Sequence, residues 1–159
     1  MNGIDPIEAL EDVTRAIYRV AARVPPTEAV TGPDVAYGSM HVAVPPLNAV
    51  FGARFTGTSA DARIDDVVAW FAARTMQPFW WVGPADTPLD LPERLLAKGL
   101  MEGEPLPGMA ADLTLLHDES PSSGITIERV RDDRTFAVSC DVAVEGFGLP
   151  SEVGQIFAR

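Results

Sequence analysis

The spacing of proline limits how this chain can fold more than any other feature of its sequence. Its fourteen prolines separate apolar runs and do not form a continuous tract; the clearest divisions stand at positions 25, 26, 45, 46, 84, 88, 105, 107 and 121. Proline between apolar runs is typical of turns and loops, because it interrupts both helices and strands. The pattern predicts an ordered chain of short elements joined by short connections.

A chain of 159 residues, 47% of them hydrophobic, has enough apolar surface for one ordinary domain core and a small remainder. Its single cysteine, Cys140, excludes an internal disulfide framework, because such a framework needs thiols in pairs. A cysteine-rich zinc cluster is excluded for the same reason. Packing of side chains must therefore hold the fold together.

The net charge of −11 at pH 7 disfavours a polyanionic partner. Basic faces bind nucleic acids and anionic membranes, so neither is expected as a partner. No apolar stretch approaches the roughly 20 residues of a membrane span, and the segment from Met1 to Asp12 lacks the basic and apolar regions of a secretory signal. We expect a cytoplasmic protein.

The first predicted element is an amphipathic helix. Asp5, Pro6 and Glu8 suit the N-cap and the first turn, and Pro25-Pro26 ends the pattern. The residues expected to face a core are Leu10, Val13, Ile17, Val20 and Val24. Between Asp34 and Phe55 the chain is rich in Val, Phe and Tyr, which predicts two or three strands.

A second helix is predicted after Thr58 or Ser59, either of which suits its N-cap. Its spacing is that of a face packed on a sheet, with Ile64, Val67, Val68, Phe71 and Ala72. The run from Phe79 to Val82 is apolar at every position, which predicts a strand covered on both faces. We therefore expect this strand in the centre of the sheet.

A third, short helix is predicted from the cap pattern of Asp90, Pro92 and Glu93, with Gly99 as its stop. Leu91, Leu95 and Leu96 supply its apolar face. Residues 100–104 and 109–116 then read as strands, and they predict an antiparallel hairpin around residues 105–108.

The segment HDESPSSG, residues 117–124, has the composition of a linker. We expect a domain over residues 1–117, a linker over 118–124 and the start of a second domain over 125–159. That start comprises a strand at Ile125 and Ile127, a helix and a further helix; the apolar residues expected on the two helices are Phe136, Cys140, Val144, Phe147, Val153, Ile156 and Phe157.

About 35 residues of strand and helix are too few to close a core without disulfides or metal, because segments below roughly 40 residues usually need such support. The second segment is therefore expected either to dock on the first domain or to belong to a domain whose second half is missing.

Three motifs resemble the amino-terminal domain of bacterial two-domain proteins of the GNAT superfamily of N-acetyltransferases: FWWVGP (79–84), RLLAKGL (94–100) and PGMAADL (107–113). Past the linker, GITIERV (124–130) and EGFGLP (145–150) are similar to the first strand and the loop after the first helix of a standard GNAT domain. The resemblance implies an α/β fold with a central, twisted mixed sheet flanked by helices. It also implies transfer of an acyl group from acyl-CoA, with acetyl-CoA as co-substrate, to a small-molecule or peptide amine.

GNAT domains hold the pyrophosphate of acyl-CoA on a loop of the pattern Q/R-x-x-G-x-G/A at a helix N-terminus. At the corresponding place this chain reads FTGTSADAR (55–63), with one glycine, Gly57, and with Asp61 in the first helical turn. We interpret the first domain as a degenerate, non-catalytic copy. No residue is assigned to cofactor binding or to catalysis.

Three residues are candidates for contact with the acceptor amine. Glu145 and Phe147 lie in the loop that walls the acceptor side of GNAT domains, where a carboxylate could orient or deprotonate an ammonium. The competing interpretation is a helix C-terminus with a core Phe147 and a capping Gly148. Trp81 could line a pocket, but neighbours in a strand face opposite sides, so core packing is favoured for Trp80-Trp81.

The remaining chemically reactive residues have structural interpretations. Cys140 shares a helix face with apolar residues, which favours a buried, inert thiol. His41 and His117 lack a second ligand at helical spacing, so no metal site is expected. The aspartates and glutamates near helix starts complement the helix dipole.

Two classes of function stay open. The chain is either the non-catalytic half of a GNAT-type N-acyltransferase together with the start of the catalytic half, or a non-enzymatic binding or regulatory module with a degenerate GNAT fold. A further expectation is a homo-oligomer, or docking to a missing domain, through the apolar face of the helix that starts at Ser151.

Overall fold

The computed structural model describes residues 5–23, 25–109, 111, 113–115, 124, 126, 128–151 and 153–154. The chain divides into two compact units, Met1–Ala110 and Ala111–Arg159, called unit 1 and unit 2 below. Most of the predicted linker, the predicted strand at Ile125 and Ile127, and His117 lie outside the described residues.

Unit 1 contains a four-stranded mixed sheet in the order β1-β2-β3-β4. Its strands are β1 (Glu28–Thr31), β2 (Ala36–Ser39), β3 (Asn48–Phe51) and β4 (Phe79–Trp80). The first two pairs are antiparallel, whereas β3 and β4 are parallel, with Val50 beside Trp80. Parallel neighbours need a crossover connection, which here contains helix α2 (Ala60–Ala72). The expected mixed α/β architecture is present.

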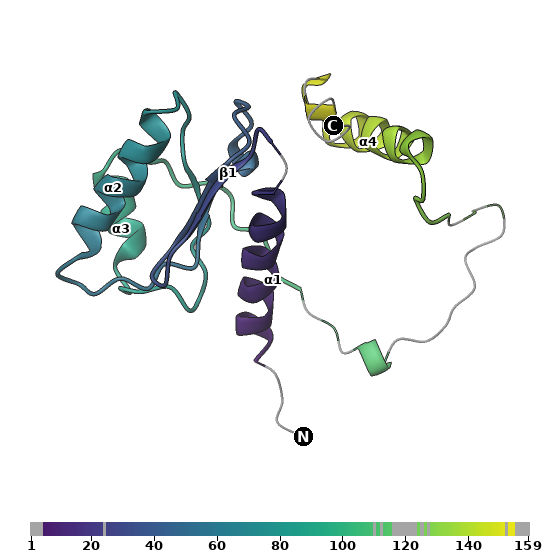
Figure 1. Ribbon diagram of the computed structural model, residues 1–159. Helices are drawn as coiled ribbons and strands as arrows, with labels where there is room; N and C mark the ends of the chain where they lie inside the picture. The colour runs from purple at the N-terminus through teal and green to yellow at the C-terminus, as the bar shows by residue number, and fades with distance from the viewer. Residues whose placement is uncertain are drawn as a thin grey trace. The chain divides into compact units, whose positions relative to one another are not determined.

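Helices cover both faces of this sheet. Helix α1 (Pro6–Ala21) lies on one face, and α2 lies with α3 (Leu91–Ala97) on the other (Figure 1). Successive residues of a strand alternate between faces. Ala36 and Phe51 accordingly form a cluster with Tyr18 of α1, whereas Tyr37 and Val50 join the cluster beneath α2.

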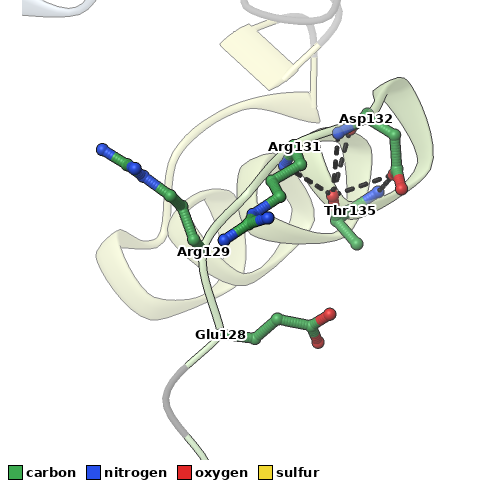
Figure 2. A pocket seen from close by; sticks show the side chains of 5 residues that line it. All are labelled: Glu128, Arg129, Arg131, Asp132 and Thr135. Atoms are coloured by element: carbon green, nitrogen blue, oxygen red, sulfur yellow. Dashed lines mark hydrogen bonds between the residues drawn. The ribbon is translucent and has the colours of Figure 1, made fainter.

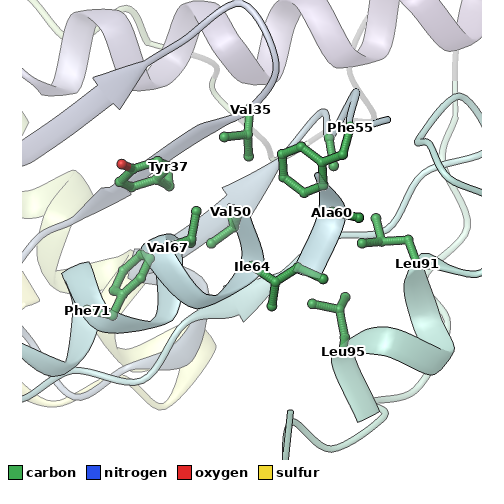
Figure 3. Close-up of a cluster of buried hydrophobic side chains, with 11 residues drawn as sticks. Val35, Tyr37, Val50, Phe55, Ala60, Ile64, Val67, Phe71, Leu91 and Leu95 are labelled. Carbon is green, nitrogen blue, oxygen red and sulfur yellow. The ribbon is translucent and has the colours of Figure 1, made fainter. Parts of the chain in front are cut away.

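The larger core lies between the sheet and helices α2 and α3 (Figure 3). Ile64, Val67 and Phe71 of α2 have no exposed surface, so the face predicted for this helix is confirmed at these positions. Leu91 and Leu95 extend the core onto α3. Aromatic rings border this core. The ring centroids of Trp70 and Tyr37 are 5.1 Å apart, and those of Trp80 and Phe55 are 6.3 Å apart. The guanidinium carbon of Arg74 lies 3.6 Å from the centroid of the Trp70 ring.

Helix α1 begins as predicted, because the Asp5 carboxylate accepts a hydrogen bond of 2.9 Å from the Ile7 amide. Its predicted core face is wrong. Its described members leave 43% to 60% of their surface exposed; they are Leu10, Val13, Ile17 and Val20. Together with Ile7, which is 39% exposed, they are called the α1 stripe below. Val24 lies outside the described residues.

A different side of α1 contacts the sheet. The Tyr18 ring packs 4.9 Å from that of Phe51, its hydroxyl donates to the Pro46 carbonyl at 3.1 Å, and burial raises its pKa to about 12. Arg15 Nη2 donates to the Gly52 carbonyl at 2.7 Å. The helix also lies close to β2, because a Cβ on Gly38 would stand 2.8 Å from Tyr18 Cδ1. Contacts that mix polar and aromatic groups thus replace the expected aliphatic ones.

The structure corrects three strand predictions. Within the run at residues 79–82, the two-residue strand β4 lies at the edge of the sheet and not in its centre. The prediction failed because an apolar run indicates that both faces of a strand are covered, but it does not determine the order of the strands. Strand β1 was not predicted. Residues 101–109 form no strand, and residues 113–115 form the short 3-10 helix η2 (Leu113–Leu115) in place of a hairpin. Pro105 and Pro107 have no N–H to donate to a ladder.

The short elements otherwise end where the sequence indicates. The 3-10 helix η1 (Pro45–Leu47) follows the Pro pair before β3, and Gly99 ends α3 with φ +87°. Such a φ favours glycine, which has no Cβ. Asp90 precedes α3 but makes no side-chain cap bond to it.

Unit 2 contains helix α4 (Asp133–Phe147), which confirms the helix predicted there. Asp132 and Thr135 form a reciprocal capping box, and Gly148 ends the helix with φ +61°. Cys140 is buried, as expected. Phe147 is 80% exposed, so the interpretation of Phe147 as a core residue is wrong. Among the described residues of both units, no helix is long and apolar enough to cross a membrane.

Candidate functional site

The carboxyl edge of the parallel strands β3 and β4 is the part of unit 1 where a ligand site is expected, because ligands of α/β sheets bind beyond the carboxyl ends of such strands. After β3 the chain runs through residues 52–59 into α2, and after β4 it runs through residues 81–90 into α3. The two loops meet at a parallel bridge between Arg54 and Thr87.

An ion cluster joins these loops to α1. Arg54 donates through Nη1 to Asp86 Oδ1 at 3.0 Å and through Nη2 to Glu11 Oε2. The second oxygen of Asp86 accepts the Gly83 amide at 2.9 Å. Arg54, Glu11 and Asp86 are called the Arg54 cluster below. It ties helix α1 to both loops at the carboxyl edge of the sheet.

The cluster is closed and short of positive charge. The Asp86 side chain is 2% exposed, and its burial raises the pKa of its carboxyl above the ordinary value, with the Glu11 charge acting in the same direction. Glu11 Oε1 is buried and has no hydrogen-bond partner among the described residues. Asp86 is shielded from water and both carboxylates are engaged by one guanidinium, an arrangement that fits a structural clamp rather than a group that handles substrate.

The N-terminus of α2 does not fit the pyrophosphate of acyl-CoA. The amides of Ser59 and Ala60 both donate to the Thr56 carbonyl at 3.0 Å, so these two donors are used inside the loop. Asp61 places a carboxylate in the first turn, where it pairs with Arg94 at 2.9 Å. A dianionic ligand needs free amides and no anion at this position.

The nearest cation on α2 is also engaged. Arg63 pairs with Asp34 at 2.7 Å and with Asp66 at 3.1 Å. The hydrogen bond from Arg63 lowers the pKa of the Asp34 carboxyl. Arg63 is therefore committed to holding the β1–β2 turn, which contains Asp34, onto α2.

The structure places the three predicted contact residues in different units. Trp81 follows β4 in unit 1, where its ring packs 4.9 Å from that of Phe79 and 37% of its surface is exposed. Trp80 packs against the large core, which confirms that the two neighbours face opposite sides. Glu145 and Phe147 lie together in the last turn of α4 in unit 2, and both are exposed.

Sequence reasoning missed the Arg54 cluster. Its members lie 32 and 43 residues apart along the chain, and no local spacing connects them. Asp86 is one of the aspartates that the sequence analysis assigned to helix starts, but its carboxylate instead accepts the Gly83 amide and caps that turn. The one hint in the sequence was Arg54 itself, a charged residue between the predicted strands and the predicted second helix.

Unit 2 has an open depression beside the start of α4, lined by Glu128, Arg129, Arg131, Asp132 and Thr135. Figure 2 shows that Asp132 and Thr135 bond to one another, while the charged ends of Glu128, Arg129 and Arg131 point in different directions. The residues converge on no common point, so the depression has no built binding site.

The described residues contain no group of three or more His, Cys, Asp or Glu side chains that could hold a metal ion. His41 instead contacts Glu28 at 2.8 Å. The Glu28 carboxylate also accepts from Arg74, and these bonds lower its pKa, the one from Arg74 most strongly.

The fold defines unit 1 as a three-layer α/β protein with a four-stranded mixed sheet. Comparison of the chain with protein-family models, with curated proteins and with solved structures gave no match. The GNAT resemblance of the sequence motifs therefore stays a prediction.

Proposed function

We propose that this chain supplies the non-catalytic domain of a GNAT-type N-acyltransferase, which transfers an acyl group from acyl-CoA to an amine. The resemblance implies the order helix, strands, helix, central strand, helix and two closing strands. Unit 1 contains α1, then β1 to β3, α2, β4 and α3 in that order, with β4 at the sheet edge and no closing strands among the described residues. The carboxyl edge of β3 and β4 is where such a fold would hold acyl-CoA.

One observation carries the non-catalytic assignment. Groups of the chain itself occupy the start of α2. The Thr56 carbonyl accepts hydrogen bonds from two backbone amides, and Asp61 in the first turn forms an ion pair with Arg94. The Arg54 cluster beside it is closed by α1. These contacts support the proposal, because they occupy the place where a GNAT-type fold would need free amides for acyl-CoA.

The alternative is a non-enzymatic binding or regulatory module. The exposed α1 stripe favours it, because a row of apolar side chains on a helix surface is typical of interaction sites. The two functions differ in what the reading frame encodes beyond Arg159. A strand, a Q/R-x-x-G-x-G/A loop and a helix there would support the enzyme, whereas a stop codon would contradict it for this polypeptide.

The binding test is a calorimetric titration of acetyl-CoA into the whole chain, shown to be folded by circular dichroism. We expect no saturable heat. Saturable binding that survives in Gly103→Ala but is lost in Gly57→Ala would locate acetyl-CoA at the start of α2 and overturn the non-catalytic assignment. Both glycines have open space around an added Cβ, so the pair is matched.

A further inference from the structure

Two carboxylates and one guanidinium leave the Arg54 cluster with one negative charge in excess when all three groups are ionised. The side chains of Asp86 and Glu11 are only 2% and 18% exposed, so water stabilises this excess charge poorly. Three of the four carboxyl oxygens accept hydrogen bonds, whereas Glu11 Oε1 is buried and accepts none from the described residues. Uptake of one proton would make the cluster neutral.

The charged groups of the surrounding elements do not balance this excess. Arg15, one turn beyond Glu11 on α1, donates to the Gly52 carbonyl, and Glu8, one turn before Glu11, is a further acid. The groups on the neighbouring turn and helices form ion pairs of their own, Asp34 with Arg63 and both Asp61 and Asp90 with Arg94. Among the described residues, Arg54 is thus the only cation in contact with either carboxylate of the cluster.

The two carboxylates belong to different parts of unit 1. Asp86 is held within its own loop, because its second oxygen accepts a backbone amide of that loop at 2.9 Å. Glu11 comes from α1, which contacts the sheet through the Tyr18 ring and Arg15 and leaves its apolar stripe exposed. Separation of α1 from the sheet would leave Arg54 paired with Asp86 alone. Docking of α1 therefore brings in the excess negative charge.

We propose that the Arg54 cluster is a proton-dependent latch for α1, in which the Glu11–Asp86 pair holds one proton while the helix is docked and loosens the helix when that proton is lost. The proton belongs to the pair, because strongly interacting carboxyl groups titrate together. Burial raises the pKa of the Asp86 carboxyl above 3.8, and the Glu11 charge acts in the same direction. The docked state thus binds more protons, so docking is favoured at low pH and weakens as pH rises through the raised pKa.

Release of α1 also changes the carboxyl edge of β3 and β4. Arg54 Nη2, which donates to Glu11 in the docked state, becomes free at the edge where a ligand of an α/β sheet is expected. The latch gives unit 1 a closed state that acid favours and an open state that higher pH favours. This inference does not rest on the proposed acyltransferase function.

Amide hydrogen exchange of the whole chain at a series of pH values tests the latch. Protection factors correct for the pH dependence of intrinsic exchange and report the opening of α1 itself. We expect the protection of α1 to fall as pH rises from 3.8, about tenfold for each unit by which docking raises the pKa of the pair. Protection of α1 that stays constant up to about pH 7 would overturn the proposal.

A pair of variants separates the latch from an ordinary ion pair. Glu11→Gln keeps a carbonyl oxygen for Arg54 but removes the excess charge, so its α1 should be about tenfold more protected than that of the unaltered chain at about pH 7, and its pH dependence should flatten. Glu8→Gln makes the same change at an exposed position one turn away and should leave the pH dependence unaltered. Protection of α1 in Glu11→Gln equal to or below that of the unaltered chain at about pH 7 would show that Glu11 forms no such latch.

Discussion

Helices α1 and α2 have the same kind of sequence pattern but differ in how far their apolar sides are buried. Both repeat apolar residues at helical spacing, but α2 buries Ile64, Val67 and Phe71 completely, whereas α1 leaves Ile17 57% and Val20 60% exposed. The difference shows that periodicity identifies a helix and its apolar side but does not identify what that side will contact.

The sheet explains the difference. Its face beneath α2 presents Val35, Tyr37 and Val50, which offer a broad apolar surface to aliphatic side chains. Its face beneath α1 presents Ala36, Ala49 and Phe51, with Gly38 beside them. Small residues let one large ring, that of Tyr18, approach closely, and the hydrogen bond from Arg15 to the Gly52 carbonyl adds a polar contact.

The largest effect should come from truncating the same residue type in the two helices. Ile64→Ala should lower the free energy of unfolding by about 2–5 kcal/mol, because it leaves a cavity in a packed core. Ile17→Ala should change it by no more than about 0.5 kcal/mol in the monomer, since the side chain is mostly in water. Urea unfolding at concentrations where the chain is monomeric measures both. If both variants lost the same free energy of unfolding, the two helices would not differ in how much their apolar sides stabilise the fold.

The close approach of α1 is tested by enlarging Gly38. Gly38→Ala should destabilise unit 1 by about 1–3 kcal/mol, because its Cβ would meet the Tyr18 ring at 2.8 Å and the Glu28 carbonyl oxygen at 2.9 Å. Gly103→Ala is the control, since nothing lies within 4 Å of its Cβ. Thermal unfolding distinguishes them, and a neutral Gly38→Ala would show that α1 sits less tightly on β2.

Removing the cation of the Arg54 cluster should have a somewhat smaller effect. Arg54→Ala should cost about 1–2 kcal/mol of stability, because Asp86 loses a partner in a buried position but is able to take up a proton. Lys98→Ala removes an exposed pair with Asp65 and should cost less than about 1 kcal/mol. If the two costs were equal, the cluster would be an ordinary surface ion pair.

The smallest effect is a pair of opposite pH dependences. The pKa of Asp34 is lowered from 3.8, so this carboxylate stabilises the fold above 3.8, and that contribution is lost as pH falls through its lowered pKa. The pKa of Asp86 is raised from 3.8, so its ionisation destabilises the fold as pH rises from 3.8 through the raised value.

Relative to the unaltered chain, Asp34→Asn should therefore lose stability as pH rises over its window, and Asp86→Asn should gain it over its own. Urea unfolding at a series of pH values measures both differences. Slopes of the same sign for the two variants would contradict the different surroundings described for the two carboxyl groups.

The parts of the fold that sequence predicted are those that local chemistry determines. The Asp5 cap, the buried side of α2, the stop at Gly99 and the helix after Asp132 each depend on residues within a few positions of one another. Short hydrogen bonds and the φ of glycine act over the same range. Such features are readable from one sequence.

The parts that sequence missed depend on distant segments. The position of β4 at the sheet edge is fixed by pairing with β3, some thirty residues away, and the Arg54 cluster joins three separate segments. The predicted strand at residues 100–104 had a plausible composition, but strands need partners. Of the two interpretations of Glu145, the structure agrees with the helix C-terminus and not with a loop, although the exposure of Phe147 was not foreseen.

The placement of the tryptophans gives the two units different optical signatures. All three, Trp70, Trp80 and Trp81, belong to unit 1, so tryptophan emission reports on that unit alone. Far-ultraviolet circular dichroism also records α4 of unit 2. If the units melt independently, the two spectroscopic curves will not superimpose, and their separation will measure how strongly one unit depends on the other.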